Sequence, residues 1–312
     1  MFNLRDGYDF PPFRPPNEAS SALIRVTRGC PWNRCEFCTM YKGTRFQMRP
    51  IDDVKRDIDR ASEIFRGSST VFIADSDSLV RKDIVEIMEF IRDRFPDARR
   101  ITSYGRARTL RVLGPERLAR IRKAGLTRIH MGLESGDGPT LELMQKGVDP
   151  EEMIAGGRAA REAGLDLSLY VLIGAGGPDR LKEHALGSAR VCNEIDPDFI
   201  RLRTLVVERD SSLEAKLKLG TFKTTTPLQK LVEVHTFVEA LEVSDCEFAS
   251  DHFANYIWID HECVYDGIAG HLPRDKKRML SKLEKAIETV RSTDGDVQDV
   301  TILHERGLVS HL

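Results

Sequence analysis

Three cysteines crowd into one short segment of the chain. Cys30, Cys35 and Cys38 lie in TRGCPWNRCEFCTMY with C-x4-C-x2-C spacing, directly after an apolar run of strand length. Three thiols this close together in an intracellular setting indicate metal binding rather than a disulfide framework. The two chemistries that such a trio can support are a zinc site and an iron–sulfur cluster.

A zinc site and an iron–sulfur cluster place different demands on the sequence. Structural zinc is closed by four protein ligands, and neither Cys nor His follows Cys38 within the next eighty residues. The remaining cysteines, Cys192, Cys246 and Cys263, are isolated. Three cysteines that hold a four-iron cube leave one iron without a protein ligand. We favour this [4Fe-4S] arrangement, and a zinc or redox-only iron–sulfur module for binding or electron transfer remains the alternative.

With these residues the sequence resembles the radical S-adenosylmethionine (radical SAM) superfamily. In that family a C-x3-C-x2-C loop after the first barrel strand holds a [4Fe-4S] cluster, and S-adenosylmethionine (SAM) binds its open iron. An aromatic residue before the last cysteine packs near the adenine, and Phe37 occupies this position. The resemblance implies Cys30, Cys35 and Cys38 as metal ligands and catalytic cysteines. The chain departs from the family by one extra residue between the first two cysteines.

Three further segments resemble cofactor turns of the family. IADSDSL (73–79) stands where the family has a GGE-like turn, although neither Gly-Gly nor Glu is present, and an ordinary loop that caps the next helix is the alternative. HMGLESGD (130–137) is similar to the GLESGS turn of the Elp3/MiaB/NifB-like branch, and LIGAGG (172–177) resembles the adenine-contacting turn. The cofactor contacts implied in these turns are Ala74, Asp75, Ser76, Glu134, Ser135, Ile173 and Gly174.

The face of each strand that points into the barrel can also be predicted. Side chains alternate along a strand, so the apolar positions mark the face that meets the helices. The opposite face collects Arg25, His130, Glu134, Tyr170, Arg201 and Arg203. This polar set predicts a chamber, because a closed core would leave many of these groups unpaired.

Within this chamber we expect different roles for the polar residues. Arg203 is predicted to bind the carboxylate of SAM or an anionic substrate, because its planar fork suits carboxylates. His130, Tyr170 and Arg201 are the substrate candidates. Two alternatives stay open, an internal ion pair between Arg201 and Glu134 and an ordinary buried histidine at position 130.

The elements that must position these residues follow a regular rhythm. Apolar runs of strand length alternate with amphipathic helical stretches such as 84–95, which is typical of βα units and a parallel sheet. The expected strands are 22–27, 70–74, 101–105, 128–134, 167–174 and 199–206. This pattern predicts an α/β fold, a partial (β/α)6 TIM-like barrel whose strand ends carry the cysteines and the three turns.

We expect three parts along the chain. Residues 1–20 are a proline-rich extended arm, residues 21–210 are the barrel, and residues 211–312 form a mostly helical extension packed on it. In the extension, helices are expected over 227–241 and from near Pro273. The aromatic segment ASDHFANY (249–256) has the composition of a substrate lid or of a helix with one polar side.

Composition limits the classes of function. The 312 residues carry 47 Lys and Arg against 49 Asp and Glu, a formal charge of -2, which is not the basic excess of a typical nucleic-acid binder. We found neither a membrane-length apolar stretch nor the apolar core of a signal peptide, which favours a cytoplasmic protein.

As the resemblance implies, the reduced cluster would cleave SAM to methionine and a 5'-deoxyadenosyl radical, which abstracts hydrogen from a substrate. We expect a small or anionic substrate rather than nucleic acid, with a tRNA-modifying enzyme as the alternative. A ferredoxin or flavodoxin is the expected reducing partner. Neither cobalamin nor a second cluster is expected.

Overall fold

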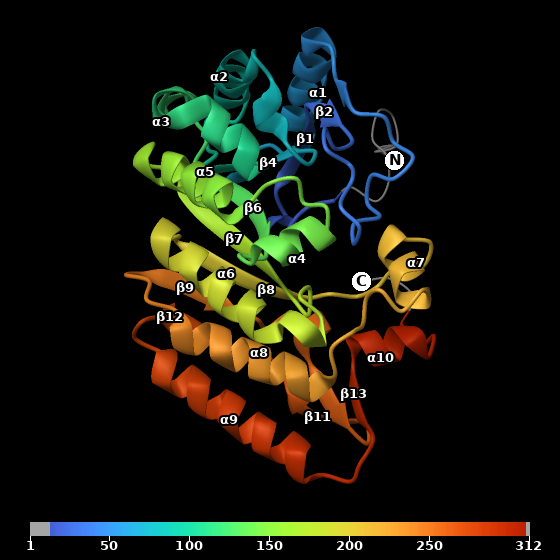
Figure 1. Cartoon of the computed structure of the whole chain (residues 1–312). Coiled ribbons are helices and arrows are strands. Elements are labelled where there is room, and N and C mark those ends of the chain that lie inside the picture. The colour runs from blue at the N-terminus through green and yellow to red at the C-terminus, as the bar shows by residue number, and fades with distance from the viewer. Residues whose placement is uncertain (1–12, 310–312) are drawn as a thin grey trace. The chain divides into compact units, whose positions relative to one another are not determined.

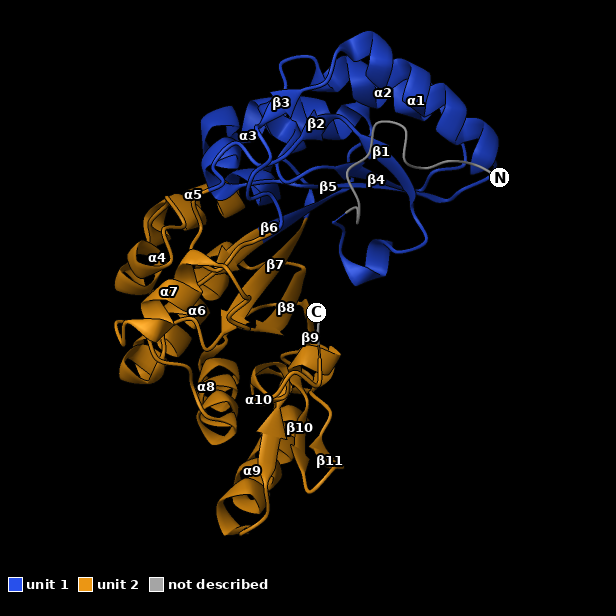
Figure 2. Ribbon diagram, turned by 90° about the vertical axis from the view of Figure 1, so that its right-hand side faces the viewer, with its two compact units in different colours: residues 1–33, 40–131, 159–166 blue, residues 34–39, 132–158, 167–312 orange. Residues whose placement is uncertain are grey.

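The computed structural model of the chain describes residues 13–309 (Figure 1). These residues divide into two compact units (Figure 2). The first unit contains the chain up to residue 33 together with 40–131 and 159–166, and the second contains 34–39, 132–158 and the chain from residue 167 onward. Of the arm expected at 1–20, residues 1–12 lie outside the described residues, and η1 (Pro16–Glu18) is a short 3-10 helix with Glu18 buried.

Parallel strands form the centre of the first unit. In spatial order they are β1 (Ala22–Arg25), β4 (Thr70–Ala74), β5 (Arg100–Tyr104) and β6 (Arg128–Glu134), the last three residues of which belong to the second unit. Residue Val71 pairs with Ala22 on one side and with Ile101 on the other. All of β4 after its first residue is buried, as expected of a parallel strand that is covered on both faces.

Helices with one apolar face cover these strands. They are α1 (Ile51–Ile64), α2 (Ile84–Arg94) and α3 (Ala107–Ala124), accompanied by the short elements β2 (Thr27–Arg28), β3 (Gln47–Met48) and η2 (Ser78–Val80). The helix expected over 84–95 is confirmed as α2. Its apolar stripe of Ile84, Ile87, Met88 and Ile91 is fully buried.

In the second unit, β7, β8 and β9 are parallel and β12 pairs antiparallel with β9. These strands are β7 (Asp166–Ile173), β8 (Phe199–Thr204), β9 (Cys246–Ala249) and β12 (Ala269–Leu272). A separate antiparallel sheet has the order β11 (Glu262–Tyr265), β10 (Ile257–Ile259), β13 (Val297–Asp299).

The helices of the second unit follow the strands along the chain. They are α4 (Gly138–Leu143), α5 (Pro150–Glu162), whose end belongs to the first unit, α6 (Leu181–Ile195), α7 (Ser212–Lys218), α8 (Pro227–Ala240), α9 (Lys276–Ser292) and α10 (Val300–Glu305), with 3-10 turns η3 (Pro178–Arg180) and η4 (Phe253–Asn255). Helix α8 packs against both α6 and α9.

The α/β class is confirmed, and each of the six predicted strands appears with its ends shifted by at most two residues. Within residues 211–309, more residues lie in helices than in strands, but β9 and β12 of this part join the sheet of β7 and β8. Strand β9 was not predicted: α8 serves as a further crossover, and β9 joins β8 in parallel. With four residues inside an aromatic segment, β9 is too short to show a clear alternation in the sequence. Within residues 13–309, no helix is long and apolar enough to span a bilayer.

Candidate functional site

The backbone just before the first cysteine is held by the turn after β4. Asp75 Oδ2 accepts a hydrogen bond from the Gly29 N–H at 2.9 Å, and Ser76 Oγ donates to the Gly29 carbonyl at 3.0 Å. Arg25 Nε and Nη2 donate to the same Asp75 oxygen at 3.0 and 2.8 Å, and both side chains are buried. The turn to which the family resemblance assigns cofactor contacts therefore also fixes the start of the cysteine loop.

The carboxylate of the neighbouring Asp77 hydrogen-bonds the start of α3, a different helix from the one that the sequence alternative named. Its carboxylate accepts hydrogen bonds from Thr109 Oγ1 at 2.6 Å and from the Arg106 N–H at 3.5 Å, so it caps the start of α3 and not the helix that follows it. Burial raises the pKa of Asp77 to about 6, against the effect of these hydrogen bonds.

The three loop cysteines form no disulfide and are partly exposed, whereas Cys192 and Cys246 are buried. Burial raises the pKa of Cys192 well above its usual value, which makes it a poor ligand. The Asn33 N–H donates to Cys30 Sγ at 3.4 Å, the kind of hydrogen bond that tunes cluster thiolates. The donor chemistry of the loop therefore fits an iron–sulfur cluster.

Cys30 belongs to the first unit, and Cys35 and Cys38 belong to the second. Across residues 13–309, no three His, Cys, Asp or Glu side chains are grouped as the ligands of one metal ion. Chain connectivity nevertheless limits the separation of Cys35 and Cys38, because three residues span at most about 11 Å.

The part of the loop in the second unit is fixed through Glu36 and Phe37. The Glu36 N–H donates to the Met144 carbonyl at 3.0 Å, and its own carbonyl accepts from the Leu213 N–H at 3.2 Å. Phe37 packs against a buried cluster formed by Met144, Leu172, Ala175, Leu205, Leu213 and Phe222. Leu172 and Ala175 flank Ile173 and Gly174, so the structure brings the aromatic residue of the cysteine motif to the LIGAGG turn.

The turn after β6 is heavily braced. Glu134 has φ of 62°, and its carboxylate lies 2.8 Å from Lys146 Nζ. Ser135 is buried and its Oγ accepts from the Asp137 N–H at 3.0 Å. Arg180 donates to both Asp137 oxygens at 2.7 Å each. Glu134 and Ser135 are thus held at a turn whose shape is set by side chains around it.

A buried pair of residues links this turn with the LIGAGG turn. His184 Nδ1 lies 3.0 Å from Glu233 Oε1, and His184 Nε2 lies 3.2 Å from the Glu134 carbonyl. The Gly174 N–H donates to both Glu233 oxygens at 3.0 and 3.1 Å. Burial alone would lower the pKa of His184, but the Glu233 carboxylate outweighs this and raises it above the usual value.

Sequence reasoning missed both members of this pair. His184 lies on the buried stripe of α6, and Glu233 lies on that of α8. A titratable residue on an otherwise apolar helix face is the signal that could have found them, because such a group needs a buried partner.

The surroundings of His130 are those of an ordinary buried histidine. It is fully buried, its Nε2 lies 3.3 Å from Glu18 Oε1, and it contacts the ring of Tyr104. Burial alone would raise the pKa of Glu18, but the hydrogen bonds from His130 and Ser21 outweigh this and lower it. The substrate role of His130 stays a prediction.

Tyr170 of β7 and Arg201 and Arg203 of β8 are half-buried. The Arg203 guanidinium lies 5.6 Å from the centre of the Tyr170 ring. The alternative ion pair between Arg201 and Glu134 is wrong, because Glu134 pairs with Lys146 and Arg201 Nη2 lies 3.3 Å from Glu247 Oε1. Glu247 belongs to β9, the strand that the sequence did not predict.

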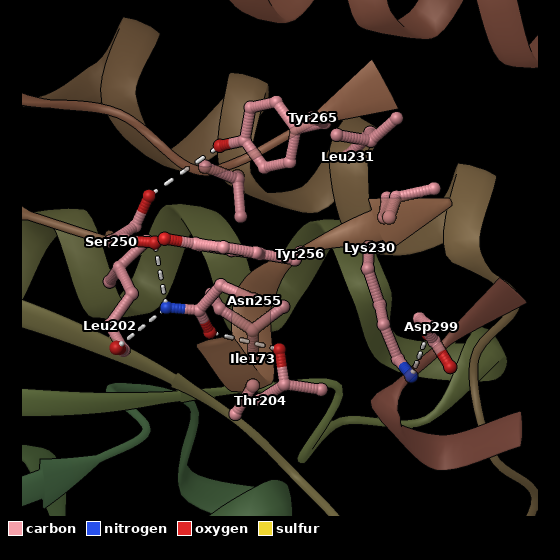
Figure 3. Close-up of a pocket in the computed structure, with 13 residues that line it drawn as sticks. Ile173, Leu202, Thr204, Lys230, Leu231, Ser250, Asn255, Tyr256, Tyr265 and Asp299 are labelled. Atoms are coloured by element: carbon pink, nitrogen blue, oxygen red, sulfur yellow. Dashed lines mark hydrogen bonds and ion pairs between the residues drawn. The ribbon is translucent and has the colours of Figure 1, made fainter. Parts of the chain in front are cut away.

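Beside β8 lies a small pocket, shown in Figure 3, with a free volume of about 20 Å³, which is room for roughly one water molecule. Asn255 forms one wall: its Oδ1 accepts from Thr204 Oγ1 at 3.0 Å, and its Nδ2 donates to the Leu202 and Ser250 carbonyls at 3.1 and 2.9 Å. Asn255 therefore fastens the aromatic segment 249–256 to the end of β8.

Comparisons with known proteins add to this geometry. Residues 24–185, more than half of the chain, match the family model described as the Radical SAM superfamily. An uncharacterised methyltransferase of Pyrococcus horikoshii is 24% identical over 180 residues, which are 57% of this chain and 38% of that protein. The chain therefore corresponds to well under half the length of this curated relative.

Several solved structures have a similar fold. Methylornithine synthase has a TM-score of 0.51 and 16% identity, covering 72% of this chain and 63% of that one. Coproporphyrinogen III oxidase of Escherichia coli has a TM-score of 0.51 and 19% identity, covering 70% and 51%. These likenesses confirm the partial barrel class. Because the family match covers the cysteine loop and the three turns described above, the chain belongs to the radical SAM superfamily, whose enzymes use a [4Fe-4S] cluster and SAM.

Proposed function

We propose that this enzyme cleaves SAM reductively and uses the radical formed to take hydrogen from a small or anionic substrate. The observation that carries the proposal is the set of three partly exposed cysteines, none of them in a disulfide, on a loop that begins beside the buried Arg25–Asp75 ion pair. When bound through these thiols, the cluster supplies the electron that breaks the carbon–sulfur bond of SAM and yields 5'-deoxyadenosyl radical and methionine.

The residues of the chain bind the cluster and orient SAM. Cys30, Cys35 and Cys38 hold the cluster, and Phe37 provides an apolar surface beside the LIGAGG turn for the adenine. Glu233 holds the Gly174 N–H, which fixes the backbone of that turn. Preorganised turns of this kind lower the entropic cost of placing the cofactor.

The surroundings of Arg203 favour its binding to an anionic substrate or to the carboxylate of SAM. The Arg203 guanidinium lies over the Tyr170 ring near the end of β8. The burial of His252 and the positive charge of Arg203 both lower the pKa of His252. His252 is therefore neutral near pH 7, and the local positive charge resides on the arginine. The lack of disulfides among the cysteines of residues 13–309 also supports a cytoplasmic location.

The test is anaerobic incubation of the reconstituted protein with dithionite and SAM, followed by chromatography for 5'-deoxyadenosine. We expect about four irons per chain and a visible absorption band of the reconstituted protein at about 400 nm. Cys30→Ala, Cys35→Ala and Cys38→Ala should each abolish 5'-deoxyadenosine, whereas Cys263→Ala, a free cysteine outside the loop, should keep it.

Full cleavage by any of the three loop variants would contradict the proposal. Zinc in place of iron would do the same. Formation of S-adenosylhomocysteine without 5'-deoxyadenosine would instead assign methyl transfer by another route.

A further inference from the structure

Positive charge is concentrated along α3, whose helical backbone is interrupted at Gly114 (φ 68°), in a chain that is otherwise balanced. Between Arg106 and Lys123 there are seven Arg and Lys residues and a single acid, Glu116, whereas the whole chain has a formal charge of -2. A local excess of this size creates a field that the net charge conceals.

The packing of α3 directs this charge to the solvent. Its buried face consists of Ala107, Leu110, Leu118, Ile121 and Ala124. Its exposed basic residues are Arg108, Arg111, Arg120, Arg122 and Lys123. The apolar side of the helix is therefore already used for packing within the first unit, and the basic side is presented outward.

The first turn of α3 lies next to the cysteine loop. The Arg106 guanidinium is 5.3 Å from the centre of the Trp32 ring, two residues after Cys30. Lys42 Nζ donates to the Asn33 carbonyl at 3.2 Å, and the Asn33 N–H in turn bonds Cys30 Sγ. Asp77 fixes this end of the helix through Thr109 and the Arg106 N–H.

We name the basic face the described residues Trp32, Lys42, Arg45, Arg106, Arg108 and Arg111. They lie in the segment after Cys30 and at the start of α3, all in the first unit. Lys42, Arg45, Arg108 and Arg111 are exposed. The basic face thus includes exposed cations at the start of α3, whose Arg106 contacts Trp32 of the loop that carries Cys30.

We propose that the basic face is the docking surface for a small acidic protein that delivers single electrons, as a flavodoxin does. This inference rests on the proposed function, because the electron it delivers is the one that reduces the cluster from the 2+ to the 1+ state while the carrier is oxidised by one electron. Its location on the cysteine loop favours an electron carrier over a nucleic acid. Electrostatic complementarity of this kind mainly raises the association rate and is weakened by salt.

The experiment compares two electron sources and two variants. Arg108→Glu/Arg111→Glu reverses the charge of the basic face, and Arg120→Glu/Lys123→Glu makes the same change on α3 twelve residues farther along the chain, beyond the interruption at Gly114. For the holoenzyme we expect the first variant to lower the flavodoxin-driven rate of 5'-deoxyadenosine formation at least tenfold and to leave the dithionite-driven rate within twofold. The second variant should change neither rate by more than twofold.

A direct binding measurement provides a readout that does not depend on turnover. Titration calorimetry with oxidised flavodoxin should give at least a tenfold weaker Kd for Arg108→Glu/Arg111→Glu, and raising the salt from 50 to 300 mM should weaken binding to the unmodified protein.

The outcomes of these experiments distinguish an error in the proposed function from an error in the proposed docking surface. If dithionite yields no 5'-deoxyadenosine from the unmodified protein, the proposed function is wrong. If dithionite works but flavodoxin binds and reduces both variants equally well, the docking surface is wrong. Loss of tRNA binding in a gel-shift assay, with flavodoxin-driven turnover kept, would assign the basic face to RNA and overturn the inference.

Discussion

The Asp75 carboxylate bonds the Gly29 N–H at 2.9 Å while it also pairs with the buried Arg25 guanidinium. One side chain therefore couples strand β1, the turn after β4 and the residue that precedes Cys30. Breaking a buried ion pair by removing one partner costs about 3–5 kcal/mol, since the other charge is left without compensation.

We predict that Asp75→Asn destabilises the protein and lowers its iron content after reconstitution. The amide oxygen can still accept from Gly29, but it no longer balances the charge of Arg25. Thermal unfolding and iron analysis measure both effects. Asp166→Asn is the matched control, because its partner Arg128 lies 3.3 Å away and the Asp166 side chain is 49% exposed. Equal shifts in Tm for the two variants would show that the Asp75 pair has no special role.

Gly29→Ala should lower the stability of the protein by more than the strain of the positive φ at residue 29 alone would. Gly29 and Gly43 have nearly the same φ, 80° and 77°, so an alanine at either position is strained by about 1–2 kcal/mol. At Gly29 the added Cβ would also lie 3.2 Å from the Thr44 methyl group, whereas at Gly43 nothing lies within 4 Å. Chemical denaturation should show a larger loss for Gly29→Ala, accompanied by less bound iron. A larger loss for Gly43→Ala would contradict this account.

The His184–Glu233 pair predicts a pH-dependent stability. The pKa of folded His184 is raised above its usual 6.5, so the stabilisation is complete below about pH 6.5 and disappears as the pH rises through the folded value. The free energy of unfolding of the unmodified protein should therefore fall relative to that of Glu233→Gln as the pH rises above about 6.5 and through the folded pKa of His184. Besides Glu233, the nearby charged groups are Asp137, paired with Arg180, and Glu134, paired with Lys146.

Denaturant titrations at a series of pH values measure this difference. His235→Gln provides a control, because His235 lies on the same helix as Glu233 but is partly exposed, 3.6 Å from Glu284. A difference that is constant with pH would mean that His184 is neutral throughout the range.

Lys230→Met should destabilise the C-terminal part of the second unit. Lys230 Nζ lies 2.6 Å from Asp299 Oδ2 and 2.7 Å from Thr301 Oγ1, and Figure 3 shows the ion pair beside the pocket. Removing the ammonium leaves a buried carboxylate, at a cost of about 3–5 kcal/mol. Lys282→Met, which breaks an exposed pair with Asp266, should cost less than about 1 kcal/mol. Recovery of stability in Lys230→Met/Asp299→Asn would confirm the cause, and no recovery would contradict it.

Much of the fold could be read from local patterns. Runs such as 128–134 alternate apolar and polar residues, and they appear as strands because each apolar side chain must meet a helix. The cysteine spacing likewise identified the superfamily, since three ligands within nine residues are a local signal. Such features do not depend on which distant element lies alongside.

The missed features depend on distant partners. The sequence shows Arg201 and Glu134 as candidates for each other, but β9 supplies Glu247 and α4 is followed by Lys146. Likewise, nothing near His184 in the sequence identifies Glu233 as its partner. Pairings of this kind follow from the packing of elements and not from spacing along the chain.

The location of Glu233 has a consequence for the boundary of the catalytic region. A polypeptide truncated after residue 210 would contain the whole family match, yet the imidazole of His184 and the amide of Gly174 would lose their shared acceptor. Helix α8 is therefore packed as part of the structure that holds the turns after β6 and β7, and it cannot be exchanged without replacing that carboxylate.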